Sequence, residues 1–314
     1  MDLPRKATQP TMYFIGVTTK QSSIMKLFPL WAKELGLKDA VLEGIDIDIH
    51  ADEKDYQDCV DFIKNDPLSK GALVTTHKID LYNATKSMFD FMDPHAEMLD
   101  EISSISKKNG KLEGHAKDPI TSGLAMEAFI PENFWHKDGE VFIMGAGGSA
   151  LAISSYLTEK KHGDNVPKKI ILSNRSEARL KSAEKLLSKI DTPTKFEYHV
   201  CPEPEDNDAI LNKLSTNSMV VNATGLGKDR PGSPLTDNGQ FPEGSLVWEL
   251  NYRGELDFMH QGLAHKENKN LHVEDGWIYF IHGWTQVIAE VFQVDIDKHF
   301  DQLEKIAHDL RMSK

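Results

Sequence analysis

Cysteine is nearly absent from this chain, in which Cys59 and Cys201 are the only two among 314 residues. Two isolated cysteines exclude a disulfide framework and a cysteine-based metal cluster, and buried free thiols are their ordinary role. No apolar run reaches the length that spans a bilayer, and the first residues lack the apolar core of a secretion signal. These absences predict a protein of the reducing cytoplasm without a membrane partner.

Basic residues are also fewer than acidic residues. Lysine and arginine number 36 against 49 acidic residues, for a net charge of -13, which argues against nucleic acid as a partner. The 13 histidines are scattered, and those near the C-terminus lack tight metal-ligand spacing. We therefore expect a small-molecule substrate and no metal, while a monomer and a homodimer are both open.

The chain is longer than one average domain, so two domains are expected. Its N-terminal part alternates between strand and helix patterns, a sign of α/β architecture. We predict strands at 12–17, 40–45 and 71–75 and helices at 24–35 and 56–64. The stretch 118–123 breaks this pattern and leads into a helix, so we place the crossing to the second domain there.

A glycine-rich turn opens the second domain. The apolar run 141–144 is typical of a buried parallel strand, and a small-residue helix begins at Ala150. Gly145 permits a tight turn, Gly147 lets the backbone approach a pyrophosphate, and Ala150 takes the place of a third glycine. Because the next strand, 169–172, follows at the spacing of a βαβ unit, we predict a Rossmann-type dinucleotide site. Its first residues are Gly145, Ala146, Gly147, Gly148, Ser149 and Ala150.

An acid is absent where that next strand ends. Sites for NAD usually place Asp or Glu there to bind the ribose 2′-hydroxyl. This chain has Asn174, Arg175 and Ser176, which are neutral and cationic donors suited to a 2′-phosphate. The predicted cofactor is therefore NADP, with NAD as the alternative.

The remaining patterns complete the domain plan. Further strands at 196–200, 219–223, 245–250 and 270–273 would give a six-stranded dinucleotide sheet. From Tyr279 the chain reads as helical to its end, and this tail can return to the first domain. We thus predict a substrate-binding and catalytic domain at 1–120, an NADP-binding Rossmann domain at 121–276, and C-terminal helices at 277–314 that pack on the first domain.

Six motifs occur in an order that carries family information. The segment 71–78 is similar to Gly-x-Asn-Val-Thr-x-Pro-x-Lys but one residue shorter, and 114–118 is similar to Gly-x-Asn-Thr-Asp. The segments 145–150, 174–176, 221–224 and 249–252 follow. In this order the motifs resemble the shikimate dehydrogenase family, including quinate/shikimate dehydrogenases, over almost the whole chain.

The resemblance implies an NADP-dependent oxidoreductase that interconverts a secondary alcohol and a ketone on a small cyclic polyhydroxylated substrate, expected to be anionic. It implies Lys78 and Asp118 as the catalytic pair. Hydride transfer needs a group that moves the hydroxyl proton, and a lysine beside a carboxylate can do so. The alternative is a sensor that binds dinucleotide or metabolite without turnover, because folds do not fix functions.

The resemblance also implies ligand contacts. Substrate contacts fall on Ser22, Thr75, Ser103 and Tyr252, and further cofactor contacts on Asn222, Ala223, Thr224 and Gly276. Lys20 stands where the family has the first serine of a Ser-x-Ser pair. It would bind an anion, pair internally with an acid, or lie exposed in a loop.

Other family positions have changed. Leu73 and Ala116 replace asparagines, and Gly283 replaces a glutamine for which Gln286, one helical turn on, is a candidate substitute. Shikimate is the leading named substrate. Quinate, an aminated analogue and another cyclic polyol remain open.

Overall fold

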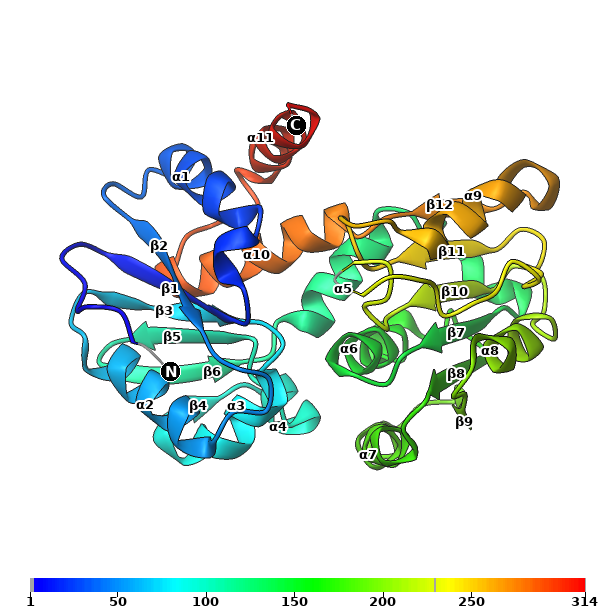
Figure 1. Cartoon of the computed structure of the whole chain (residues 1–314), viewed down its shortest axis with the longest axis horizontal. Coiled ribbons are helices and arrows are strands. Elements are labelled where there is room, and N and C mark those ends of the chain that lie inside the picture. The colour runs from blue at the N-terminus through cyan, green and yellow to red at the C-terminus, as the bar shows by residue number, and fades with distance from the viewer. Residues whose placement is uncertain (1–2, 229, 314) are drawn as a thin grey trace. The chain divides into compact units, whose positions relative to one another are not determined.

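The computed structural model describes residues 3–228 and 230–313. The chain divides into two compact units, 1–117 together with 283–314, and 118–282 (Figure 1). We predicted borders after residues 120 and 276, whereas these units divide after residues 117 and 282. The second division falls inside one helix, α10 (Trp277–Phe292).

The first unit is built on a mixed sheet of six strands in the order β2-β1-β3-β5-β6-β4. Strands β2, β1 and β3, which form one side of the sheet, are parallel, whereas β5 is antiparallel to both β3 and β6. The bounds are β1 (Thr11–Gly16), β2 (Val41–Asp46), β3 (Ser69–Val74), β4 (Phe91–Met92), β5 (Ser104–Lys108) and β6 (Lys111–His115). The three predicted strands are confirmed as β1 to β3, and β4 to β6 were not predicted.

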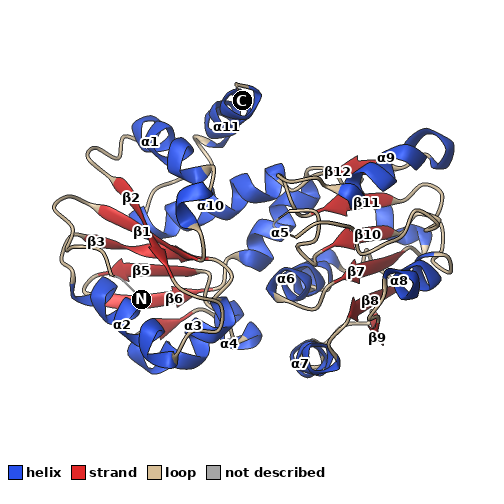
Figure 2. Ribbon diagram, viewed as in Figure 1, coloured by secondary structure: helices blue, strands red, loops and turns tan. Residues whose placement is uncertain are grey.

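Helices cover both faces of this sheet (Figure 2). They are α1 (Ile24–Glu34), α2 (Glu53–Asn65), α3 (Lys78–Thr85), α4 (Pro94–Leu99), part of α10, and α11 (Phe300–Met312). Tyr13 and Ile15 point to one face and join a core with Val60 of α2. On the other face the ring of Phe14 lies 4.9 Å from that of Trp284 in α10.

The C-terminal helices belong to the first unit, as predicted. The indole nitrogen of Trp31 in α1 donates to the carbonyl oxygen of Leu303 in α11 at 2.8 Å. The predicted C-terminal helices are two, α10 and α11. Helix α10 ends at Phe292, and Gln293 has a left-handed φ of 55°, which a continuing right-handed helix does not accommodate.

The second unit contains an all-parallel sheet in the order β12-β11-β10-β7-β8-β9, confirming the predicted Rossmann-type topology. Its strands are β7 (Glu140–Met144), β8 (Lys169–Asn174), β9 (Lys195–Val200), β10 (Met219–Asn222), β11 (Leu246–Glu249) and β12 (His272–Glu274). Its other helices are α5 (Asp118–Glu127), α6 (Gly148–Leu157), α7 (Glu177–Leu187), α8 (Pro204–Leu211) and α9 (Asp257–Lys269). Buried Phe142, Val220 and Val247 build its core.

One expected break is absent. The stretch 118–123 is itself the start of α5, since Asp118 is its first residue and Pro119 the second. A proline in the first helical turn sacrifices no hydrogen bond. None of the described helices is both long and apolar enough to cross a membrane.

Candidate functional site

Several predicted substrate residues lie at one edge of the first unit's sheet. Strands β1 and β3 are parallel neighbours, so their carboxyl ends meet at the same edge. Thr75 follows β3, and its backbone N–H donates to the carbonyl oxygen of Ile15 in β1 at 3.0 Å. A Cβ on Gly16 would lie 3.1 Å from the side chains of both Thr19 and Thr75, so the small residue permits this close approach.

Lys78 and Ser103 are held at this edge by backbone hydrogen bonds. Lys78 is the first residue of α3, and its carbonyl oxygen accepts from the N–H of Ile102 at 3.1 Å. The next residue, Ser103, donates its N–H to His115, and its hydroxyl oxygen accepts from the N–H of Lys117 at 2.7 Å. The fold therefore brings Thr75, Lys78 and Ser103 together although the segments that carry them are separate in sequence.

The loop after β1 carries Lys20 and Ser22. Asp46, at the end of β2, accepts hydrogen bonds from the N–H and the hydroxyl of Thr19, at 2.9 and 2.6 Å. These bonds fix the short 3-10 helix η1 (Thr19–Gln21). Lys20, within η1, is exposed, whereas Ser22, directly after it, is half-buried.

Gln286 lines a pocket of about 340 Å³ in the first unit. The other lining residues are Lys108, Lys117, Ala289, Glu290, Gln293 and Val294. Gly283 lies one turn earlier on the same helix, and a Cβ there would meet nothing within 4 Å. Crowding at the Cβ position therefore does not explain why this chain has glycine at position 283 instead of the family's glutamine.

The second unit carries the predicted dinucleotide residues. Gly145 follows β7 with φ +127°, and a Cβ there would lie 2.6 Å from the carbonyl oxygen of Ala223, so only glycine fits. Gly147 has open space around its Cβ position, and α6 begins at Gly148. Strand order reverses between β7 and β10, which is where such sheets bind ligands. The free amides of α6 can receive a pyrophosphate.

The loop after β8 lacks an acid at the predicted ribose position. The Asn174 side-chain oxygen accepts from the N–H of Ser176 at 2.8 Å, and the Ser176 hydroxyl caps α7 by accepting from the N–H of Arg179. Arg175 is exposed between them. This leaves a guanidinium and the amide nitrogen of Asn174 as donors for a phosphate.

A buried carboxylate that we did not single out supports the neighbouring loop. Glu249 ends β11 and has no exposed surface. One of its oxygens accepts from the backbone and side-chain nitrogens of Asn251, at 2.8 and 2.6 Å, and the other accepts from Asn222 at 2.7 Å. Burial raises the pKa of Glu249 to about 7, although these hydrogen bonds oppose the shift.

The same network shapes the predicted cofactor segment 222–224. The Asn222 side-chain oxygen accepts from the N–H of Thr224 at 3.1 Å and from its hydroxyl at 2.7 Å. The carboxylate of Glu249 thus orients Asn222, and Asn222 orients Thr224. The sequence feature that could have indicated this role of Glu249 is an acidic residue at the end of an apolar strand.

Gly276 and Tyr252 lie near this network. The N–H of Gly276 donates to Asn251 at 3.0 Å, and a Cβ on Gly276 would lie 2.0 Å from the carbonyl oxygen of Leu250. The ring of half-buried Tyr252 packs against Phe280, with centroids 4.5 Å apart, and against Trp277. Asp118, buried at the start of α5, also belongs to the second unit.

Known proteins resemble both the sequence and the fold. No protein-family model matches the sequence. Shikimate dehydrogenase (NADP(+)) of Streptococcus thermophilus is 27% identical over 165 residues, 52% of this chain and 53% of that protein. The Lactococcus lactis enzyme of the same name is 26% identical over 58% of this chain and 64% of its own. The chain therefore spans between half and two thirds of the length of these curated relatives.

Solved structures match over nearly the whole chain. Shikimate dehydrogenase from Aquifex aeolicus has a TM-score of 0.72 at 18% identity, covering 98% of this chain and 99% of that one. Quinate dehydrogenase from Corynebacterium glutamicum, solved with NAD, scores 0.70 at 17% identity over 95% and 98% of the two chains. Ligand-free 5-ketofructose reductase of Gluconobacter scores 0.69 at 15% identity over 96% and 99%.

The two units define a two-domain α/β fold with a Rossmann-type sheet. The sequence is distantly related to shikimate dehydrogenases, and the fold is that of their solved structures.

Proposed function

We propose that this protein is an NADP-dependent oxidoreductase that interconverts a secondary alcohol and a ketone on a small cyclic polyhydroxylated substrate. The observation that carries the proposal is Lys78, positioned by α3 at the carboxyl edge of the first unit's sheet beside Thr75 and Ser103. A dinucleotide-type sheet in the same chain supplies the place for a hydride carrier.

In this proposal Lys78 transfers the proton of the reacting hydroxyl. A bound nicotinamide would exchange hydride with the carbon that bears this hydroxyl. Asp118 is the partner of Lys78, as the family resemblance implies. A lysine is suited to this role because its ammonium is a compact donor whose pKa responds to its surroundings. Thr75 and Ser103 provide hydroxyl groups at the same edge for substrate oxygens.

Preference for NADP is supported by the loop after β8. Arg175 is exposed, and no acid accompanies Asn174 and Ser176. A guanidinium binds a 2′-phosphate through charge-assisted hydrogen bonds. The relatives are consistent with either cofactor, because the names of the Streptococcus and Lactococcus enzymes specify NADP(+) and the quinate dehydrogenase structure contains NAD.

The substrate class is tested by a panel of cyclic polyols, hydroxy acids and their ketones, including shikimate, quinate and 5-ketofructose, with each nicotinamide followed by absorbance. The exposed Lys20 at η1, in place of a serine, suits an anionic substituent on the substrate. Turnover of one panel member with NADP(H), at enzyme far below substrate concentration, is the expected result. Binding of NADPH without turnover of any ketone would favour the sensor.

The catalytic assignment is tested by Lys78→Ala. Loss of the proton-transfer group should lower kcat by about 10²–10⁴-fold, while NADPH binding, measured by its fluorescence, stays within twofold. Lys86→Ala is the matched control, because Lys86 is an exposed lysine at the other end of α3. Near-normal turnover in Lys78→Ala would refute the assignment.

A further inference from the structure

One face of the β5–β6 hairpin is polar although most of it is buried. The hairpin register pairs Ser104 with His115 and Ser106 with Glu113. Alternate residues Ile105 and Leu112 enter the apolar core on the opposite face. Polar groups on a buried sheet face are costly unless they are hydrogen-bonded, and charged groups unless they are paired or bind a metal.

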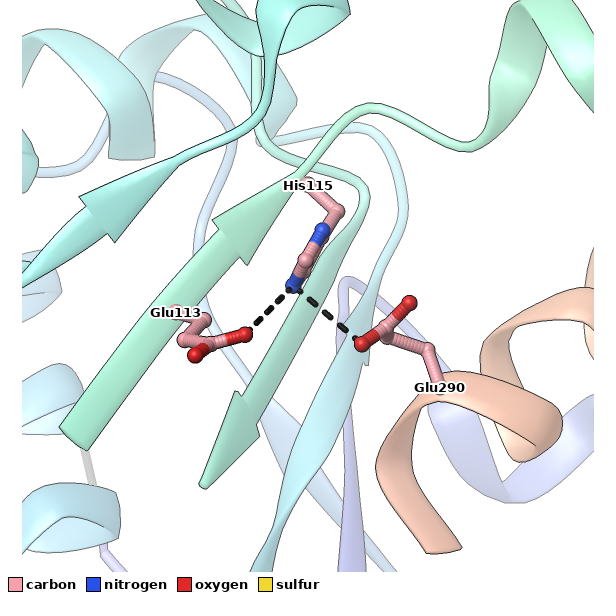
Figure 3. Close-up of side chains that lie close together, drawn as sticks. All are labelled: Glu113, His115 and Glu290. Atoms are coloured by element: carbon pink, nitrogen blue, oxygen red, sulfur yellow. Dashed lines mark ion pairs between the residues drawn. The ribbon is translucent and has the colours of Figure 1, made fainter. Parts of the chain in front are cut away.

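His115 is the centre of this polar face. Its side chain is 8% exposed, and its Nε2 atom lies 3.6 Å from Oε2 of Glu113 and 3.4 Å from Oε1 of Glu290 in α10 (Figure 3). These three ligand atoms lie within 4.8 Å of one another. The hydroxyl of Ser106, 3.3 Å from the same nitrogen, is an alternative partner within the protein.

A fourth side chain orients the imidazole. Asp93 lies 3.6 Å from the other ring nitrogen, Nδ1 of His115. Asp93 is itself fixed, because its second oxygen accepts the N–H of Ala96 at 2.7 Å as the cap of α4. A carboxylate behind a histidine is the usual outer partner of a metal-binding imidazole.

The cluster carries more negative than positive charge. Three carboxylates, those of Asp93, Glu113 and Glu290, face His115, and their side chains are only 13%, 15% and 19% exposed. Lys117 lies 2.5 Å from Oε2 of Glu290 and leaves Oε1 directed at His115. Buried carboxylates in such excess favour a bound cation.

The spacing suits a particular kind of cation. Ligands about 2.0–2.1 Å from a tetrahedral zinc ion lie about 3.4 Å from one another, close to the 3.4 and 3.6 Å found around His115 Nε2. One imidazole and two carboxylates form a donor set that zinc and its neighbours accept. The pocket that Glu290 and Lys117 line adjoins the cluster at Glu290 and offers space there for water or a ligand oxygen.

We propose that Glu113, His115 and Glu290 form a binding site for one divalent transition-metal ion, zinc by its ligand chemistry, with Asp93 orienting the histidine. This site departs from our expectation from the sequence that the protein binds no metal. It does not depend on the proposed oxidoreductase activity, because its test measures the ion itself.

The test is titration of Zn²⁺ by calorimetry, and of Co²⁺ by visible absorption, into the full-length protein after chelator treatment and dialysis. We expect one equivalent of saturable binding, a Co²⁺ spectrum of four-coordinate intensity, and a zinc-dependent rise in Tm. His115→Gln and Glu113→Gln should each weaken binding at least about 100-fold, and Asp93→Asn about 10-fold, as outer-partner changes do.

His272→Gln is the matched control. His272 also lies beside a glutamate, with Nε2 3.2 Å from Glu274, but this pair is exposed, so its loss should leave binding unchanged. Glu113→Gln keeps the test decisive if His115→Gln fails to fold. Absence of a saturable site at 1 mM metal, or equal binding by wild type and Glu113→Gln, would overturn the proposal whether or not ketone reduction is observed.

Discussion

Glu249 should make the stability of the protein depend on pH in a direction unusual for a carboxylate. Its ordinary pKa is 4.5 and burial raises the folded value to about 7. Between these values the folded protein retains a proton that the unfolded chain loses. The contribution of Glu249 to stability is therefore greatest at and below pH 4.5. It falls as pH rises toward 7 and changes no further above pH 7.

The size of the effect follows from the two pKa values. At about 1.4 kcal/mol per tenfold difference, the shift from 4.5 to about 7 corresponds to a loss of about 3 kcal/mol across the window. The side chain is fully buried, so solvent screening does not reduce it. The pKa of about 7 already includes the three hydrogen bonds from Asn222 and Asn251, which lower the pKa but are outweighed by burial.

Urea unfolding of wild type and Glu249→Gln at pH 4.5 to 8.5 isolates this contribution. The glutamine cannot ionise, so the stability of wild type minus that of the variant should fall by about 3 kcal/mol as pH rises. Glu255→Gln, at an exposed position after the same strand, should give a constant difference. A constant difference for Glu249→Gln as well would show that the asparagine donors outweigh burial and would refute the reasoning.

Three further predictions concern ligand binding and packing. Arg175→Ala should raise KM for NADPH at least tenfold through loss of charge-assisted contacts, and equal effects on NADH would show that this loop does not bind the phosphate. Lys20→Ser should raise KM for an anionic substrate with little change in kcat, and unchanged affinity and substrate ranking would make Lys20 a solvated cation. Gly276→Ala should lower stability by about 1–3 kcal/mol in thermal unfolding, because the methyl group meets Leu250, whereas Gly147→Ala, with open space, should spare stability and weaken cofactor binding. A stable Gly276→Ala would contradict the packing argument.

The second unit was predictable because its inner strands β7, β8, β10 and β11 are short apolar runs that the sheet buries on both faces. The first unit's hairpin was missed because its polar face hides the strand pattern. Its signal was nevertheless present, since Asn109-Gly110 is a strong hairpin dipeptide and both residues adopt positive φ.

Candidate site residues within local motifs could be proposed from sequence, whereas contacts assembled by tertiary structure could not. Lys78 and Thr75 lie in one short segment, and the parallel strands place that segment at an edge. The contact of Lys117 with Glu290 joins residues 173 positions apart, and neither residue belongs to a motif that indicates the other. Their functional roles remain predictions.

The first unit's two-segment construction constrains when it can form during synthesis. Its sheet is complete in sequence at residue 117, but α11, which covers α1 through the Trp31–Leu303 hydrogen bond, is translated last. At about 5–20 residues per second, the ribosome needs on the order of 10–40 s to make the intervening chain. Throughout that interval the N-terminal sheet lacks part of its cover, while residues 118–282 emerge as an uninterrupted unit. The nascent first segment therefore exposes apolar surface that the C-terminal helices later cover, at Phe14 and Trp31 among others.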